Sequence, residues 1–175
     1  MLSEKIKENI RDIQDFPKRG ILFKDITPIF ELPDLCTEIL EGFIEALSNS
    51  KIDAVACIES RGFFFGMLLA QKLRVPFIPI RKKGKLPYKT LSLDYELEYG
   101  TETMEMHVDA IKPGQNVLIH DDVLATGGTA LAASQLIMKA GGNIAGYAFL
   151  LSVGFLEGDK KLQFISQNII TLAEY

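Results

Sequence analysis

Two periodicities of hydrophobic and polar residues divide the chain into helical and extended segments. Apolar residues at helical spacing over 2–15 predict an amphipathic helix, which the pair Phe16-Pro17 ends. Gly20 opens a turn into a short apolar stretch over 21–30, and a second helix begins at Pro33-Asp34. The apolar face of this second helix consists of Leu35, Ile39, Phe43, Ile44 and Leu47.

Apolar runs rich in β-branched residues follow, and helical segments separate them. The runs cover 52–58, 75–80, 116–124 and 143–153, and they have the composition of strands covered on both faces. Helices are predicted over 63–73 and 129–140, and residues 164–172 are predicted to add edge strands. Strands joined through helices run parallel with right-handed crossovers. We therefore expect an α/β fold with a mainly parallel, twisted central sheet flanked by helices.

A segment of alternating residues interrupts this order. Leu93, Tyr95, Leu97 and Tyr99 alternate with polar residues, which predicts a half-exposed strand. A turn at Gly100 leads to an antiparallel partner over 103–108. Residues 81–90, before this pair, are predicted to form a basic loop. Its cations are Arg81, Lys82, Lys83, Lys85 and Lys89.

The composition fits one folded domain and excludes several classes of protein. The chain has 175 residues, 47% of them hydrophobic, and a formal net charge of -4. High apolar content with small net charge disfavours disorder, and this length supports one complete core, so we predict a single domain over 1–175. The acidic balance argues against nucleic-acid binding, although a local basic patch can still bind a phosphorylated ligand.

The cysteines and the N-terminal segment indicate the compartment. Cys36 and Cys57 lie in apolar runs, where free buried thiols are expected. The segment MLSEKIKENIRD alternates in charge and lacks the apolar core of a secretory signal. No run approaches the roughly 20 apolar residues of a membrane span. We therefore expect a cytoplasmic protein that does not associate with membranes.

The strongest candidate for chemistry is HDDVLATGGTA at 120–130, where a strand runs into a small-residue loop that opens a helix. Glycine N–H groups and a helix N-terminus favour a phosphate, and Thr126 and Thr129 can donate hydroxyl hydrogen bonds to it. Asp121 and Asp122 would repel that phosphate unless they face sugar hydroxyls or a bridging divalent cation. The loop therefore predicts a ligand with a phosphate next to a ribose diol.

Two alternatives for this loop carry less weight. Neither GxxxxGK[ST] nor GxGxxG is present, so it is not a Walker loop or a dinucleotide fingerprint. A plain helix N-cap of Thr and Gly would explain the loop residues. It would not explain why two carboxylates stand at the end of the preceding strand. A ligand site is the better interpretation.

Five stretches together resemble one enzyme family. DDVLATGGT at 121–129 resembles the phosphoribosyl-pyrophosphate (PRPP) signature of the type I phosphoribosyltransferases, and its form with Ala125 resembles the adenine phosphoribosyltransferases. Four other stretches also resemble motifs of this family and occur in the family's order: FPKRGILFKDITP (16–28), ESRGFFFG (59–66), RKKGKLP (81–87) and EYG (98–100). The resemblance implies the type I fold with a small N-terminal hood at about 1–33 and a mobile β-loop over Tyr88 to Leu97.

The resemblance also implies a reaction and its partners. Adenine and PRPP would give AMP and pyrophosphate, with Mg²⁺ bound through PRPP and reached by Asp121 and Asp122 through water rather than held in a protein cage. These enzymes are usually homodimers, which extends that expectation to this chain. Purine salvage is the implied role.

Three groups of residues are assigned to PRPP by the resemblance. The 5-phosphate meets Ala125, Thr126, Gly127, Gly128 and Thr129. The ribose hydroxyls face Asp121 and Asp122. The pyrophosphate group meets Ser60, Arg61, Arg81, Lys82 and Lys85.

The base and the proton chemistry fall to other residues. The resemblance assigns adenine to Leu22, Phe23 and Lys24, and catalysis to Glu98 and Arg61. Glu98 would meet the purine N7, because a carboxyl group desolvated against the base can be protonated near neutral pH.

One departure from the family pattern and three rival functions remain open. His120 stands where the family more often has a branched aliphatic residue, so it is either a strand residue of the core or a group that perturbs the titration of the acidic pair. Enzymes acting on hypoxanthine and guanine typically have Asp in place of Ala125, and orotate enzymes differ in the loop after the acidic pair. A non-catalytic PRPP sensor would not require Glu98, Arg61 and Lys82.

Overall fold

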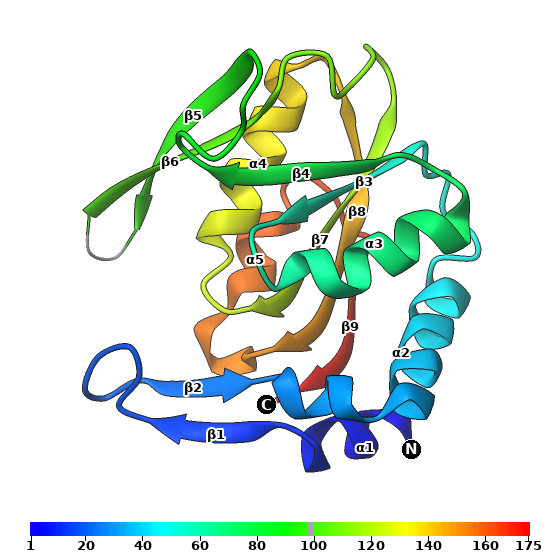
Figure 1. The fold of residues 1–175 in the computed structure, drawn as a ribbon, viewed down its shortest axis with the longest axis vertical. Helices are drawn as coiled ribbons and strands as arrows, with labels where there is room; N and C mark the ends of the chain where they lie inside the picture. Colours follow the sequence, from blue (N-terminus) through cyan, green and yellow to red (C-terminus); the bar gives the residue numbers. More distant parts are fainter. Residues whose placement is uncertain (98–99) are drawn as a thin grey trace.

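The computed structural model describes residues 1–97 and 100–175, and its main feature is a seven-stranded sheet with the order β5-β6-β4-β3-β7-β8-β9 (Figure 1). The parallel strands are β3 (Ala54–Ile58), β4 (Phe77–Lys82), β7 (Asn116–Leu124), β8 (Asn143–Ser152) and β9 (Ile169–Glu174). At one edge, β5 (Thr90–Leu97) and β6 (Gly100–His107) form an antiparallel hairpin that joins β4. The predicted α/β fold with a mainly parallel sheet is confirmed.

Helices cover both faces of this sheet, because the side chains of each central strand alternate between two cores. One face packs against α1 (Leu2–Glu8), α2 (Pro33–Ala46) and α3 (Gly62–Leu73). The other face packs against α4 (Gly128–Lys139), with α5 (Gly158–Leu162) beside it. In β3, Val55 and Cys57 belong to the first core, and Ala54, Ala56 and Ile58 belong to the second.

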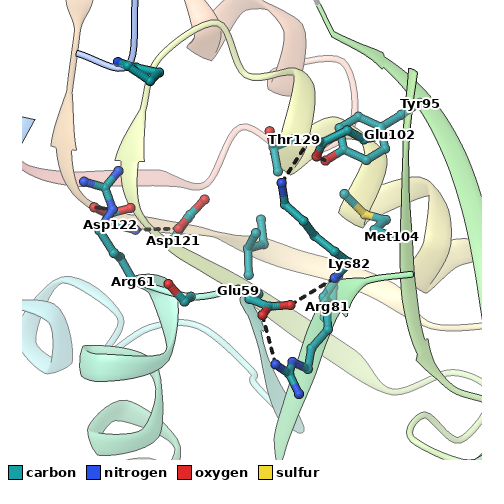
Figure 2. A pocket seen from close by; sticks show the side chains of 14 residues that line it. Glu59, Arg61, Arg81, Lys82, Tyr95, Glu102, Met104, Asp121, Asp122 and Thr129 are labelled. Atoms are coloured by element: carbon teal, nitrogen blue, oxygen red, sulfur yellow. Dashed lines mark hydrogen bonds and ion pairs between the residues drawn. The ribbon is translucent and has the colours of Figure 1, made fainter. Parts of the chain in front are cut away.

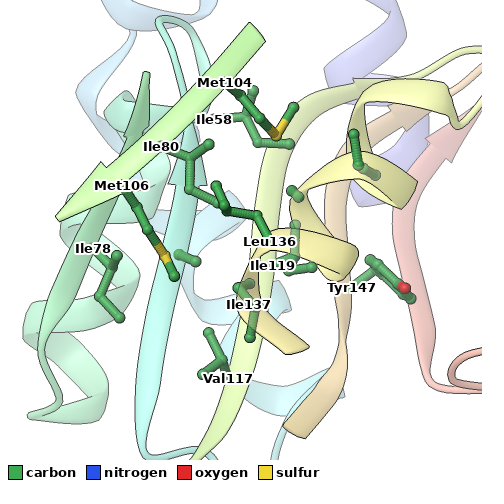
Figure 3. Packing of buried hydrophobic residues seen from close by; sticks show 14 of the residues in the cluster. Ile58, Ile78, Ile80, Met104, Met106, Val117, Ile119, Leu136, Ile137 and Tyr147 are labelled. Carbon is green, nitrogen blue, oxygen red and sulfur yellow. The ribbon is translucent and has the colours of Figure 1, made fainter. Parts of the chain in front are cut away.

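The core beneath α4 holds the strands that end at the cleft described below. Figure 3 shows Ile80, Ile119 and Leu136 meeting between β4, β7 and the helix. Fully burying such a side chain contributes about 1.5–3 kcal/mol to folding. Tyr147 is also fully buried, and its hydroxyl is 2.7 Å from the Ser134 hydroxyl, so its polar atom keeps a partner.

The predicted helix over 2–15 is wrong in its second half. Helix α1 ends at Glu8, where the Asn9 side chain donates a hydrogen bond to the Lys5 carbonyl. The next residues form β1 (Arg11–Gln14), which pairs antiparallel with β2 (Leu22–Asp25). Ile10 and Ile13 keep helical spacing, but the cross-strand backbone bonds of this hairpin override the periodicity. The hairpin lies beyond the carboxyl ends of β7, β8 and β9 (Figure 1).

Several other boundaries differ from the sequence-based expectation. Arg81 and Lys82, predicted in a loop, are the last residues of β4, opposite Glu105 and Met104 of β6. The sequence did not predict the short helices η1 (Thr27–Glu31), η2 (Gly154–Leu156) and α5, and the C-terminal segment forms one strand, β9. The remaining predicted strands and helices are present within a few residues of their expected ends.

The structure also describes the two cysteines and the lengths of the helices, on which the sequence-based expectations about thiols and membrane spans depend. Both cysteines are free, with Cys57 fully buried and Cys36 half-buried. Burial raises the pKa of both thiols, which makes them unreactive packing groups. Among the described residues, no helix has the length and apolarity needed to cross a membrane.

The strand order favours a ligand site between β3 and β7. The chain leaves β3 through α3 toward β4 on one side, whereas β7 continues through α4 toward β8 on the other side. Loops diverge at such a reversal and leave a crevice at the carboxyl ends of the strands. Ser60 and Arg61 follow β3, and Asp121 and Asp122 lie near the end of β7.

Candidate active site

A cleft of about 560 Å³ lies at this point, a size typical of small-ligand sites. Side chains from β3, β4, β5, β6, β7 and α4 reach it, together with the loop after β3. Its lining residues are Pro17, Ile58, Glu59, Ser60, Arg61, Ile80, Arg81, Lys82, Tyr95, Glu102, Met104, Asp121, Asp122 and Thr129. The cleft is therefore lined by the predicted acidic pair, Asp121 and Asp122, together with three of the predicted cations, Arg61, Arg81 and Lys82.

The two carboxylates occupy one end of the cleft (Figure 2). Asp122 is 4% exposed, and its backbone N–H donates to Oδ1 of Asp121 at 2.9 Å. Burial raises the pKa of Asp122, and burial together with the charge of Asp122 raises the pKa of Asp121 well above its usual value. Because both carboxyl groups have lost contact with bulk water, they favour partners that donate hydrogen bonds or carry positive charge.

Arg61 links the acidic pair to the N-terminal hairpin. Its Nε lies 2.9 Å from Oδ2 of Asp122, and its Nη1 donates to the Lys24 carbonyl at 3.3 Å. The guanidinium also stacks 4.5 Å from the centre of the Phe23 ring. One planar cation therefore contacts three structural parts: the end of β7, the backbone of β2 and an aromatic side chain.

Glu59 organises the basic end of the cleft. Its Oε1 accepts a hydrogen bond from Nη2 of Arg81 at 2.9 Å, and its Oε2 accepts one from the backbone N–H of Lys82 at 3.0 Å. The Arg81 bond holds the pKa of Glu59 below its usual value, so the carboxylate stays ionised. The peptide bond between Glu59 and Ser60 is cis. The Lys82 ammonium extends toward Glu102 on the opposite wall.

The small-residue loop forms a separate cavity of about 70 Å³ beside the cleft. It is lined by Asp121, Val123, Leu124, Ala125, Thr126, Gly127, Gly128, Thr129, Ala130 and Phe149. Gly127 has a φ of 75°, a left-handed conformation that favours glycine, and the 12-residue helix α4 begins at Gly128. A loop of this kind at a helix N-terminus suits an anion.

The hairpin carries the residues predicted to bind a base. Phe23 is half-buried between the Arg61 guanidinium and the Phe16 ring, whose centre is 5.0 Å away. The Lys24 ammonium forms an ion pair with Asp12 at 2.7 Å and lies 3.8 Å from the centre of the Tyr175 ring. Phe23 therefore contacts Arg61, which lines the cleft. The Lys24 side chain is instead held by Asp12 and Tyr175.

Among the described residues predicted for the site, Lys85, Leu22, Phe23 and Lys24 line neither the cleft nor the loop cavity. Lys85 lies in the turn after β4, where its carbonyl accepts a hydrogen bond from Arg81. Leu22 is 48% exposed on the hairpin. Glu98 falls outside the described residues.

The cleft also has lining residues that the sequence reasoning did not assign. Glu59 stood in the quoted motif ESRGFFFG without a role, and its position directly before Ser60 was the available signal. Tyr95 and Glu102 face each other across β5 and β6, and the alternation of the hairpin could have placed both on its inner face. Met104 belongs to the same face.

His120 is a core residue on the face of β7 that packs against α2 and α3. It is 1% exposed, and its ring meets Phe43 edge-on at 5.4 Å between centres. Burial lowers the pKa of His120 to about 4, so the ring is neutral at physiological pH. This geometry supports the packing role over the titrating one.

Comparison with known proteins agrees with this geometry. Residues 24–169 match the model of the phosphoribosyl transferase domain. The chain is 53% identical, over 175 residues, to an adenine phosphoribosyltransferase of Cytophaga hutchinsonii, covering 100% of this chain and 97% of that protein.

Two solved structures extend the agreement to the fold. The adenine phosphoribosyltransferase of Thermoanaerobacter pseudethanolicus has a TM-score of 0.95, 48% identity and complete coverage (100%) of both chains. The enzyme of Trypanosoma brucei, in complex with AMP, pyrophosphate and ribose-5-phosphate, has a TM-score of 0.88 at 27% identity, covering 99% of this chain and 79% of that one. With the sequence resemblance thus confirmed along the whole chain and across the fold, this protein belongs to the adenine phosphoribosyltransferases of the type I phosphoribosyltransferase family.

Proposed function

We propose that this protein transfers the 5-phosphoribosyl group of PRPP to adenine, which gives AMP and pyrophosphate. The observation that carries the proposal is the set of groups around the cleft and the cavity beside it: an anion loop, a carboxylate pair that lines both cavities through Asp121, and a basic end. PRPP has a matching set of phosphate, ribose diol and pyrophosphate. Family membership and the ligands of the Trypanosoma brucei enzyme support the same reaction.

Each part of PRPP meets its predicted partners in this arrangement. The loop Ala125, Thr126, Gly127, Gly128 and Thr129 holds the 5-phosphate through backbone N–H groups and hydroxyls. Asp121 and Asp122 accept hydrogen bonds from the ribose hydroxyls, which compensates for their removal from water. The pyrophosphate group binds Ser60, Arg61, Arg81, Lys82 and Lys85, with Lys85 reaching it from the turn after β4. Holding both ends fixes the anomeric carbon for attack.

Mg²⁺ fits this site as a group carried in by PRPP. Within residues 1–97 and 100–175, no group of three or more His, Cys, Asp or Glu side chains is arranged to hold a metal ion. The pair Asp121 and Asp122 supplies oxygen donors at the ribose end, and Mg²⁺ commonly uses one or two carboxylates, water and substrate phosphates. When bound, the ion offsets negative charge that develops on the leaving pyrophosphate.

The N-terminal hood, residues 1–33, covers the base. Phe23 stacks on adenine, and the backbone of Leu22 and Lys24 reads its edge. Arg61 now occupies part of the Phe23 ring face and can move toward the pyrophosphate when the base binds. Glu98, outside the described residues, handles the purine N7 proton as N9 attacks. Ala125 leaves no carboxylate in the phosphate loop for a 6-oxopurine, which favours adenine.

A homodimer is part of the proposal. Phe64, Met67 and Leu68 are 48%, 53% and 39% exposed on one stripe of α3. An exposed apolar stripe on the helix that follows Arg61 is suited to a second copy of the chain. Sedimentation of the wild type and of Met67→Lys tests this, since the lysine variant should be monomeric. A cytoplasmic location remains a prediction of the sequence.

The first experiment is a base-conversion assay dependent on PRPP and Mg²⁺. Adenine, hypoxanthine, guanine and xanthine are offered separately, and AMP from adenine alone is expected. Conversion of a 6-oxopurine would keep the PRPP site but overturn the base assignment. Measurable PRPP binding without any conversion would favour a non-catalytic sensor.

A further inference from the structure

A carboxylate lies at the end of the cleft proposed for pyrophosphate. Glu102 of β6 accepts a hydrogen bond on Oε1 from Nζ of Lys82 at 2.9 Å, and one on Oε2 from the Tyr95 hydroxyl at 3.2 Å. Figure 2 shows the Lys82 side chain crossing the cleft toward Glu102, beside Thr129. All four residues line the cleft. The Glu102 carboxylate therefore pairs with the Lys82 ammonium, a cation that the proposed function assigns to the leaving pyrophosphate.

The sheet register fixes this contact. Tyr95 of β5 stands directly opposite Glu102 of β6, and Lys82 of β4 stands opposite Met104. Because side chains two positions apart share a face, Glu102 and Met104 point the same way as Lys82 and Tyr95. The edge hairpin thus brings its carboxylate to the basic strand end by strand pairing alone.

Tyr95 supports the carboxylate as a neutral donor. Burial, with a contribution from Glu102, raises the pKa of Tyr95 to about 12, so the hydroxyl keeps its proton at physiological pH. The hydroxyl can therefore hold Glu102 in place when Lys82 moves away. A lysine ammonium on a flexible four-carbon stem can exchange one anionic partner for another.

We propose that Glu102 is a positioning residue that holds Lys82 in the empty cleft and competes with pyrophosphate for it. This inference rests on the proposed function, because it concerns the pyrophosphate end of that same site. Lys82 moves from Glu102 to the pyrophosphate group when PRPP binds, and it returns to Glu102 when pyrophosphate leaves. Competition of this kind weakens ground-state binding and speeds release of the product.

Glu102→Gln is the direct test, since it keeps the shape and removes the charge. Calorimetry with inorganic pyrophosphate and with PRPP should show binding about threefold to fivefold tighter than in the wild type, the scale of a partly exposed ion pair. The KM for PRPP should fall, and kcat should fall where pyrophosphate release limits turnover. Unchanged or weaker pyrophosphate binding would overturn the proposal.

Asp94→Asn is the matched control on the same hairpin. Asp94 accepts a hydrogen bond from the Thr103 hydroxyl at 2.6 Å and is exposed away from the cleft lining. It removes the same unit of charge from β5, so pyrophosphate binding should change little. An equal tightening in both variants would mean that the total charge of the hairpin, and not the Lys82 contact, sets the affinity.

Two further variants test whether the effect passes through Lys82. In a Lys82→Met background, Glu102→Gln should lose most of its effect, and an undiminished effect would contradict the exchange. Glu102→Asp keeps the charge but is one methylene too short to contact both partners, so it should resemble Glu102→Gln. Glu102→Asp also covers the case in which the glutamine variant does not fold.

The binding arm separates this inference from the proposed function. Pyrophosphate affinity is measured without adenine, and AMP formation by the wild type is measured separately. Tighter binding in Glu102→Gln with no AMP from the wild type would support the exchange and reject the reaction. Wild-type AMP formation with unchanged pyrophosphate affinity in the variant would do the reverse.

Discussion

Gly127 and Gly158 pack backbone against backbone. A Cβ on Gly127 would lie 2.5 Å from the Gly158 carbonyl oxygen, and a Cβ on Gly158 would overlap the Ala125 carbonyl oxygen. Gly158 opens α5, so the anion loop is held from behind by a short helix far away in sequence. The shape of the proposed 5-phosphate site therefore depends on a residue outside the PRPP signature.

Gly158→Ala should weaken PRPP binding without touching the ligand. The added methyl group must displace backbone atoms of the loop, and overpacking of this kind costs about 1–3 kcal/mol. We expect PRPP affinity, measured by calorimetry, to fall about tenfold or more. Gly154→Ala is the control, because its Cβ would meet the movable Glu174 carboxylate at 2.6 Å. Equal losses in both variants would contradict the buttressing role.

Arg61→Lys should impair the enzyme although it keeps the positive charge. A lysine cannot form the ion pair with Asp122, the bond to the Lys24 carbonyl and the stack on Phe23 at once. Leaving a buried carboxylate without its partner is costly, at about 3–5 kcal/mol when a buried pair is broken. We expect kcat/KM for both adenine and PRPP to fall by at least about a hundredfold.

A double-mutant cycle checks the cause of that loss. Arg61→Lys is combined with Asp122→Asn, and the free energy of unfolding is measured by urea titration for the four proteins. The two changes should be less than additive, because Asn does not need a cation. Strict additivity would mean that Arg61 and Asp122 do not stabilise each other.

Asp121→Asn should stabilise the fold at neutral pH. Burial, then the charge of Asp122, raises the native pKa of Asp121 well above 3.8, so the native chain binds this proton more tightly than the unfolded chain does. Raising the pH from about 3.8 through the native pKa therefore lowers the free energy of unfolding of the wild type. Asn removes the ionisation and still accepts the Asp122 N–H bond.

The measurement compares urea titrations at two pH values. At about pH 7.5 the variant should be more stable than the wild type, and at about pH 3.5 the difference should vanish. The same variant should bind PRPP more weakly, which is the usual conflict between stability and function at a site. A stability gain that is larger in acid would show that the sign of the pKa shift is wrong.

The parts that the sequence predicted well are those where local pattern and tertiary structure agree. The apolar runs of β3 and β7 are buried on both faces, so composition alone identifies them. A ligand-binding role for Asp121 and Asp122 is also predicted from their position, because two carboxylates at the end of a buried strand have no structural function there. His120 points from β7 into the core, where Phe43 packs against it.

Long-range pairing accounts for what the sequence did not show. The strand β1 carries a helical pattern, and only its backbone bonds to β2 across a turn make it extended. Arg81 and Lys82 look like loop residues because they are basic, yet β6 pairs with them at the sheet edge. Glu102 and Gly158 gain importance from neighbours distant in sequence, Lys82 and Gly127 respectively, which no local motif encodes.

Glu98→Gln tests the proton chemistry that the family resemblance assigns. The glutamine keeps a hydrogen-bonding side chain of the same size but cannot exchange a proton with the purine N7. A general acid or base typically contributes about 10²–10⁴-fold to the rate, so kcat should fall by that order. PRPP affinity should stay within about twofold, because Glu98 is assigned to the base and not to the pyrophosphate end. The measurement pairs steady-state AMP formation with PRPP calorimetry in the absence of adenine. Equal losses in kcat and in PRPP affinity would remove the proton role of Glu98.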